Sequence, residues 1–463
     1  MLRWGIRCFA LAALSVALGV AWRHIASDAG EGTRPPATPP QLAALSSGEP
    51  IVRLLLADDI LEARLEIHGR PMLDTGQRRA RYTESPQTFS FVPDAAGLRN
   101  ARANQTFPHL VADPDDGVRL VLHLTLPAPT ARDSAATRAW RLELHHPVSL
   151  TRAPASGPAP ARGQPDRRPP RLRAIAHMPM EAYLEVVVPS EMPADWPPEA
   201  LKAQAVAART YALFQMESRP AAEFHLRASA ARDMAWDPVR VGLSPRARAA
   251  SRETAGIVLM EGNRLFPAYF HAECGGYTLD ARLALPHETL YYAALTGVRC
   301  QRCANLQRSA LSVRGDVELS LAELTRLLRA RGHLTSAEDL AGLSLTDNRW
   351  TDRGAAPGNP LRPGDLPRRA SWAVLRTRQG EVKAILASHL RAAAGGGRDG
   401  FTSTYARVRE LDAGLGYRFE TQGWGHGAGL CQWGARHMAQ PMLLPFTAIL
   451  QWYYPGAQLR RRW

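Results

Sequence analysis

The sequence predicts an α+β protein, with a β-rich N-terminal subdomain ahead of a region of mixed strands and helices. Short segments with alternating or continuous apolar residues indicate the strands of the first part: Ile51–Leu56, Ala63–Ile67, Val118–Leu126 and Trp140–Leu144. Apolar residues at helical spacing indicate a helix within Trp196–Phe214. Pro197 and Pro198 suit its first turn, and Glu199 suits the positive end of its dipole.

The remaining elements follow along the chain. The apolar, β-branched run Ala182–Val188 predicts a buried strand, which places Glu191 at a strand-to-helix turn. Further strands are expected at Gly256–Met260, Phe266–Phe270, Trp372–Leu375 and Val382–Leu386, and helices at Ser320–Arg331 and Pro445–Tyr454. Composition divides the chain into an N-terminal apolar segment (1–26), a linker (27–50), the β-rich subdomain (51–150), a Pro/Arg-rich linker (151–171) and a second region (172–463).

The chain is strongly basic, and its arginine-rich composition explains this charge better than a nucleic-acid partner does. Its 463 residues carry a formal net charge of +14, which is high enough to suggest a polyanionic partner. Nearly all of the base is arginine, however, and lysine occurs only at Lys202 and Lys383. No arginine cluster carries the interleaved aromatics of a single-strand binder, so we expect no nucleic-acid partner.

The N-terminal segment predicts export. Arg3 and Arg7 precede the apolar run Phe9–Trp22, which is the pattern of a secretory signal. The run is shorter than the roughly 20 residues of a membrane span. Arg23 and His24 interrupt a cleavage site, so a cleaved peptide and an uncleaved anchor both remain open. We expect a periplasmic or cell-envelope protein that meets the membrane only through this segment.

Glu191 is the candidate general acid. Apolar Met192, Pro193 and Trp196 flank it. Burial beside such groups raises the pKa of a carboxyl, which then donates a proton near neutral pH. The alternative is a carboxylate that only complements a helix dipole.

A second cluster has metal-ligand spacing. His271 and Cys274 form an H-x-x-C pair, and Cys300 and Cys303 form a C-x-x-C pair. Together they predict a tetrahedral structural Zn²⁺ site. The alternatives are a Cys300–Cys303 redox pair, or His287 in place of His271 as the fourth ligand.

The third cluster is the glycine-rich segment Gly423–Gly434. Its glycines allow backbone conformations closed to other residues, so that a polymer can approach closely. Four of its side chains, together with Trp196, are candidates for stacking on or hydrogen bonding to sugars: Trp424, His426, Gln432 and Trp433. No Lys-Ser/Thr pair follows the glycines, which argues against a nucleotide loop.

The three clusters, in this order, resemble the stage II sporulation protein D and amidase enhancer family. The resemblance extends from Ile51 to the end of the chain, and the residues that carry it are Glu181–Leu184, Val188–Pro193, Glu199–Leu213, Cys274–Gly276, Gly423–Ala435 and Trp452–Gly456. Two positions depart from the family pattern. Cys431 stands where the family usually has Ser, and Asp233-Met-Ala-Trp236 is a degenerate form of Asp-Gln-x-Tyr.

The resemblance implies a lytic transglycosylase acting on peptidoglycan glycan strands stripped of stem peptides. It maps the catalytic glutamate onto Glu191, makes residues 172–463 the catalytic domain, and implies a metal bound through Cys274 and His271. It also admits a non-catalytic amidase enhancer that binds glycan or a cell-wall amidase. A zinc hydrolase with an open metal site is a further alternative, although the chain has no H-E-x-x-H motif.

Overall fold

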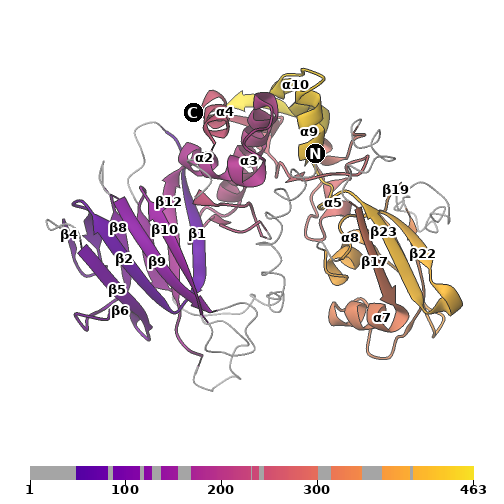
Figure 1. Ribbon diagram of the computed structural model, residues 1–463, viewed down its shortest axis with the longest axis horizontal. Coiled ribbons are helices and arrows are strands. Elements are labelled where there is room, and N and C mark those ends of the chain that lie inside the picture. The colour runs from indigo at the N-terminus through magenta and orange to yellow at the C-terminus, as the bar shows by residue number, and fades with distance from the viewer. Residues whose placement is uncertain are drawn as a thin grey trace, which may run out of the picture. The chain divides into compact units, whose positions relative to one another are not determined.

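The computed structural model describes residues 48–81, 87–114, 119–127, 137–154, 168–230, 232–238, 244–300, 314–346, 368–396 and 400–463 (Figure 1). The chain forms two compact units, which are described separately. The first comprises Met1–Pro193, Ala212–Arg248 and Trp463, and the second comprises Ala194–Tyr211 and Ala249–Arg462. The expected signal segment (1–26) and most of the first linker lie outside the described residues. Among the described residues, no helix is both long enough and apolar enough to cross a membrane.

Two antiparallel β-sheets make up most of the first unit (Figure 1). One has the order β13-β1-β12-β11-β8-β3-β4 and the other β10-β9-β2-β5-β6-β7, with only β13 parallel to its neighbour. The bounds are β1 Ile51–Ile60, β2 Glu62–His68, β3 Met72–Asp74, β4 Arg79–Arg81, β5 Gln87–Asp94, β6 Gly97–Asn100, β7 Thr106–Phe107, β8 His109–Asp113, β9 Arg119–Pro127, β10 Thr137–Leu144, β11 Val148–Arg152, β12 Leu172–Pro179 and β13 Leu226–Arg227.

Alternation along these strands builds the core of the first unit. In β2, Ala63, Leu65 and Ile67 are buried while most of the residues between them face outward. This is the period-2 pattern of a strand with one buried face. The described part of residues 51–150 forms strands and no helix, as the sequence predicts. Strand β12 pairs with both β1 and β11, so the chain from Leu172 continues the N-terminal sheet.

The predicted strand at Ala182–Val188 is wrong. Residues Met180–Glu191 form helix α2, in which most of the apolar side chains are buried. Periodicity over so short an apolar run does not distinguish a buried strand from a buried helix. Its β-branched residues favour a strand, which is why the sequence predicts one. Glu191 is therefore the last residue of a helix, and the turn that follows leads into a second helix.

Helix α3 (Pro198–Ser218) confirms the helix predicted at Trp196–Phe214 and begins at the expected proline. The division between the two compact units falls within this helix and again within α4 (Pro245–Glu253). Arg209 is completely buried on α3, and its guanidinium donates to the carbonyls of Ser251 and Ile257, each at 3.1 Å.

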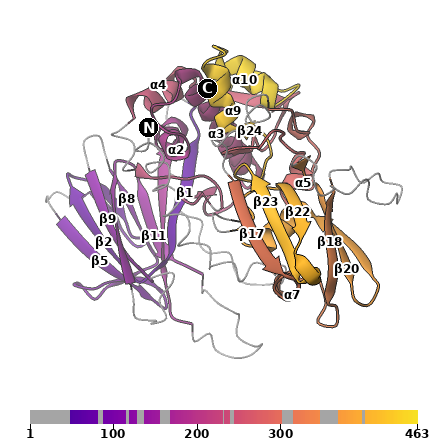
Figure 2. The same ribbon diagram turned by 45° about the vertical axis from the view of Figure 1, so that its right-hand side comes forward.

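The described residues of the second unit form four small sheets, and Figure 2 labels strands of two antiparallel ones, β17-β23-β22 and β18-β20. Their orders are β15-β14-β25, β16-β24, β17-β23-β22-β19 and β18-β20-β21. The strands are β14 Ile257–Glu261, β15 Arg264–Leu265, β16 Phe270–His271, β17 Arg314–Ser320, β18 Leu340–Thr346, β19 Arg368–Arg369, β20 Trp372–Thr377, β21 Val382–Leu386, β22 Tyr405–Glu410, β23 Gly416–Gln422, β24 Leu430–Cys431 and β25 Gln458–Arg461. The helices are α5 Ala281–Ala284, η2 Ala293–Leu295, α7 Leu321–Ala330, α8 Ala387–Ala393, η3 Asp412–Gly414, α9 Gln432–Ala439 and α10 Phe446–Tyr453.

The sequence places five elements of this unit correctly: β14, β20, β21, α7 and α10. Helices α7 and α10 begin after Ser320 and Pro445, the residues at which the sequence starts them. The strand predicted at Phe266–Phe270 is wrong over most of its length, since only Phe270 lies in a strand. Pro267 lacks the N–H that a strand needs for its ladder. Mixed helices and several sheets confirm the α+β class.

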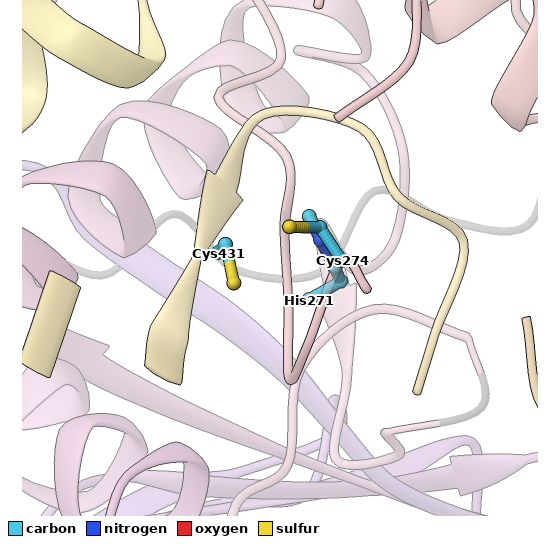
Figure 3. Close-up of side chains that lie close together, drawn as sticks. All are labelled: His271, Cys274 and Cys431. Carbon is cyan, nitrogen blue, oxygen red and sulfur yellow. The ribbon is translucent and has the colours of Figure 1, made fainter. Parts of the chain in front are cut away.

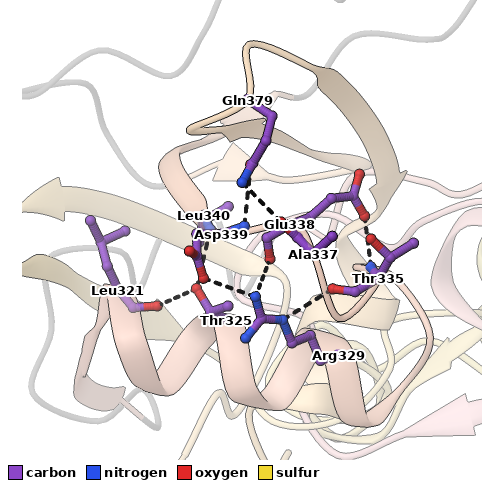
Figure 4. A network of polar contacts seen from close by, with 9 residues as sticks. All are labelled: Leu321, Thr325, Arg329, Thr335, Ala337, Glu338, Asp339, Leu340 and Gln379. Carbon is purple, nitrogen blue, oxygen red and sulfur yellow. Dashed lines mark hydrogen bonds and ion pairs between the residues drawn. The ribbon is translucent and has the colours of Figure 1, made fainter.

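A polar network fixes the segment between α7 and β18 (Figure 4). Arg329 donates to the carbonyls of Thr335 and Glu338 and to the carboxylate of Asp339, at 3.0, 2.7 and 2.8 Å. Gln379 donates to the carbonyl of Ala337 at 2.9 Å. The contacts satisfy backbone carbonyls that the connection leaves outside helix and sheet, so the network is structural.

Candidate functional site

Glu191 lies at the C-terminal end of α2, where backbone amides of a distant segment meet it. The N–H of Ala235 donates to Oε1 of Glu191 at 2.5 Å. The hydroxyl of the preceding Ser190 accepts the N–H of Asp237 at 2.9 Å and donates to the carbonyl of Val186 at 2.7 Å. The carboxylate is half-buried, and Met192 beside it is buried. The last two residues of α2 are thus held in place.

Two opposing effects act on the Glu191 carboxyl. Partial burial beside apolar groups disfavours its charged form, as the sequence analysis expects. The Ala235 N–H favours the charged form, because it donates to the carboxylate oxygen. The hydrogen bond fixes the position of the carboxyl, which is what a group that must transfer protons at one place requires.

The glycine-rich segment Gly423–Gly434 belongs to the second unit. Gly423, Gly425, Gly427 and Gly429 all have positive φ, as its glycine content indicates. A Cβ on Gly429 would lie 1.9 Å from the carbonyl oxygen of Tyr269. At this position the close approach is therefore to the protein's own backbone rather than to a polymer.

The polar side chains of this segment are engaged inside the unit. The Nε2–H of His426 donates to the carbonyl of Phe270 at 2.9 Å, and Nδ1 accepts the N–H of Ala428 at 3.1 Å. With both nitrogens used, His426 holds the segment together, and we do not retain it as a sugar-binding group. Gln432 is buried and donates to Oε1 of Gln204 at 3.4 Å.

The predicted sugar-stacking tryptophans fall into two places. Trp424 is half-buried, and its backbone pairs with Glu273 through hydrogen bonds of 2.8 and 3.0 Å. Trp196 and Trp433 pack on each other with ring centroids 4.9 Å apart. The guanidinium of Arg436 lies 5.6 and 5.2 Å from their two ring centroids, a cation–π arrangement.

Three buried side chains form a candidate metal centre (Figure 3). One ligand atom each from His271, Cys274 and Cys431 lies within 4.8 Å of the other two. Strands β16 and β24 run parallel with His271 opposite Cys431, so sheet register brings these two side chains together. Cys274 lies in the loop that follows β16, three residues after His271.

The donor set suits a soft metal ion such as Zn²⁺. The Nδ1–H of His271 donates to the carbonyl of Ala428 at 3.0 Å, which leaves Nε2 as the lone-pair nitrogen. That Nε2 atom is buried and makes no hydrogen bond within the described structure. Burial, as the largest cause, lowers the pKa of His271 well below its ordinary value and keeps the ring neutral. A neutral imidazole oriented by a backbone carbonyl is the usual form of a histidine ligand.

Both thiols accept backbone N–H groups. The amide of Gly276 donates to Sγ of Cys274, and the amide of Gly434 donates to Sγ of Cys431, each at 3.4 Å. Cys431 is the N-cap of α9, so the helix dipole also stabilises negative charge on its sulfur. Amide donors of this kind stabilise a thiolate, the form in which cysteine binds metal, whereas the thiol form of Cys431 donates to the carbonyl of Ala272 at 3.8 Å.

Cys300, another predicted ligand, is not one of the three clustered side chains, although it lies close enough to act electrostatically on His271. Cys300 is buried, and its Sγ lies 3.2 Å from the hydroxyl of Tyr453. Cys303 lies outside the described residues. Cys431 departs from the family's Ser and is not among the ligands that the sequence predicts. The signal available in the sequence was a cysteine at a position where the resembled family usually has Ser.

Comparison with known proteins adds the following. Residues 169–260 match the family model described as stage II sporulation protein. The chain is 29% identical over 281 residues to an uncharacterised protein of Brachyspira hyodysenteriae, covering 60% of this chain and 66% of that protein. It is 26% identical over 299 residues to the amidase enhancer of Bacillus subtilis, covering 60% of this chain but only 40% of that protein. It is 24% identical over 300 residues to stage II sporulation protein D of Bacillus subtilis, covering 62% and 76%.

Proposed function

We propose, from the premise that this chain contains a domain of the stage II sporulation protein D and amidase enhancer family, that it is an exported peptidoglycan lytic transglycosylase. Glu191 would be its single general acid/base. The observation that carries the proposal is the half-buried Glu191 carboxyl, fixed at the end of α2 by the Ala235 N–H at 2.5 Å.

The reaction needs one proton-transfer group. Hydrolytic glycosidases use two carboxyl groups, one for the leaving oxygen and one for water or as nucleophile. In a lytic transglycosylase the muramic acid's own C6 hydroxyl replaces the water. Glu191 gives its proton to the glycosidic oxygen as the bond to C1 breaks. The resulting carboxylate takes the C6 hydroxyl proton as O6 bonds to C1, which leaves a 1,6-anhydro end and restores the acid.

The proposed Zn²⁺ would be held by His271, Cys274 and Cys431. Bound there, it would link the β16 segment to the start of α9 and supply folding free energy rather than a chemical step. Cys300 and Cys303 are the proposed sources of a fourth ligand. The burial of all three described ligands supports a closed structural site over the open site of a zinc hydrolase.

A non-catalytic role is the second candidate. One relative is named an amidase enhancer, and this chain spans less than half of that protein. In this case the chain would bind glycan strands or a cell-wall amidase without cutting. The proposal of export depends on the N-terminal segment. A reporter fusion to residues 1–50 would show whether this segment is cleaved or retained as a membrane anchor.

The test is the product released from purified denuded glycan. Wild-type protein should release anhydro-ended fragments, detected by mass spectrometry. Glu191→Gln keeps the shape of the side chain but has no acidic proton to give, so turnover should fall about a hundredfold or more while glycan binding persists. Glu185→Gln, a carboxyl earlier on the same helix, is the matched control and should retain activity.

Two outcomes would overturn the proposal in different ways. Equal release by wild type and Glu191→Gln would show that Glu191 is not the acid. Binding of glycan by both proteins without release by either would favour the amidase-enhancer role. Trp424→Ala should weaken glycan binding under either function.

A further inference from the structure

The segment that meets Glu191 contains the motif Asp233-Met-Ala-Trp236. It begins at β13, where Arg227 ends a short strand parallel to β1. A tight turn follows, in which the N–H groups of Arg232 and Asp233 donate to the carbonyl of Ser229 at 3.0 and 2.9 Å. After the turn, Met234 pairs with Ala228, the residue that follows β13, in a parallel bridge.

The carboxylate of Asp233 closes this turn. Its Oδ2 accepts the backbone N–H of Arg227 at 2.9 Å and lies 3.9 Å from the guanidinium of the same residue. Only 6% of the Asp233 side chain is exposed. A buried carboxylate bonded to a backbone amide is a strong constraint, because breaking the bond leaves a buried charge unsatisfied.

The two residues that contact α2 follow at once. The N–H of Ala235 reaches the Glu191 carboxylate, and the N–H of Asp237 reaches the Ser190 hydroxyl. In an extended chain, N–H groups two residues apart point to the same side. The path of the backbone after Asp233 therefore decides whether both donors face the end of α2.

We propose that Asp233 is a positioning residue for Glu191: by closing the turn on Arg227, it holds the Ala235 N–H on the Glu191 carboxylate and so favours its ionised form. This inference rests on the proposed function of Glu191. It also gives the degenerate family motif a task that its Asp alone performs. Without the hydrogen bond between Asp233 and Arg227, Glu191 would keep its proton more tightly and be a weaker acid toward the glycosidic oxygen.

The first test is kinetic. Asp233→Ala should lower kcat about tenfold, with little change in KM, at low pH where Glu191 is protonated in both proteins. It should also move the alkaline limb of the pH–rate profile, where Glu191 loses the proton that it must donate, about one unit higher. Asp233→Asn keeps an oxygen for the Arg227 N–H and should restore most of kcat. The exposed Asp195, replaced by Asn, is the control and should behave as wild type. An unchanged kcat and pH profile in Asp233→Ala would overturn the inference.

The second test does not depend on turnover. Labelling Met with carbonyl ¹³C and Ala with ¹⁵N selects the Met-Ala peptide bonds, which occur only at Met234-Ala235 and Met438-Ala439. The amide proton of Ala235 should shift as Glu191 titrates in wild type and should lose that shift in Glu191→Gln. The shift should be weakened or lost in Asp233→Ala, and its persistence at wild-type size would refute the positioning role.

The two tests separate the possible failures. In one outcome, the wild-type protein releases no anhydro products but still shows the Ala235 shift, with its loss in Asp233→Ala. That result would overturn the proposed function but support the positioning role of Asp233. Should Asp233→Ala fail to fold, the Asn variant carries both measurements: it should retain the Ala235 shift, and losing that shift while folded would overturn the inference.

Discussion

Two buried histidines should make the protein acid-sensitive well above the range in which most carboxylates titrate. His177 and His225 are 6% and 5% exposed. Nδ1 of His225 accepts the N–H of Arg53 at 3.1 Å, and Nε2 of His177 lies 2.9 Å from the Ser149 hydroxyl. Burial first, and the charge of Arg53 second, lower the pKa of His177 to about 4 and that of His225 to about 3.

The sign of the effect follows from proton binding. Below pH 6.5 the unfolded chain protonates both histidines while the folded protein does not, so folding loses stability as pH falls. Below pH 6.5, each histidine lowers the free energy of unfolding by about 1.4 kcal/mol for every unit by which the pH falls. Between pH 7 and pH 5 the pair should therefore lower the free energy of unfolding by about 4 kcal/mol, a large part of an ordinary 5–15 kcal/mol.

Urea denaturation at pH 7 and pH 5 measures this change. The double variant His177→Gln, His225→Asn keeps a side-chain amide at each hydrogen-bonding position but has nothing to titrate. Its stability should therefore differ between the two pH values by about 4 kcal/mol less than that of wild type. His145→Gln, at a largely exposed histidine, should retain the wild-type difference. Equal differences in wild type and double variant would refute the reasoning.

Three further substitutions test the second unit. Cys431→Ser should reduce Zn²⁺ to well below half an equivalent per chain by elemental analysis, and full retention would remove Cys431 from the ligand set. Arg209→Met should lower the free energy of unfolding by about 3 kcal/mol in urea denaturation, because buried carbonyls lose their donors; a loss under about 1 kcal/mol would contradict this. Gly434→Ala would place a Cβ 1.8 Å from the hydroxyl of Tyr453 and 2.8 Å from Sγ of Cys300, so its melting temperature should fall markedly, whereas an unchanged value would show that α9 can shift freely.

Local sequence patterns predicted the positions of several strands and helices correctly. Alternation of apolar residues placed β2 and β9, and helix-start residues placed α3, α7 and α10, because these signals act within one or two turns of chain. The same locality explains the failure at Ala182–Val188. The buried residues Met180, Tyr183, Leu184, Val187 and Val188 follow helical spacing, but over so short a run the valines indicate a strand equally well. Packing in the folded protein decides between the two.

The candidate sites divide in the same way. The sequence by itself predicted Glu191 as the acid and the pairing of His271 with Cys274, since each stands in a short recognisable motif. Tertiary structure alone brought Cys431 to that pair, through the parallel register of β16 and β24. It alone placed the Ala235 N–H on Glu191 and turned both nitrogens of His426 inward. Hydrogen bonds and ligand sets join atoms far apart along the chain, and the distances between such atoms exist only once the chain has folded.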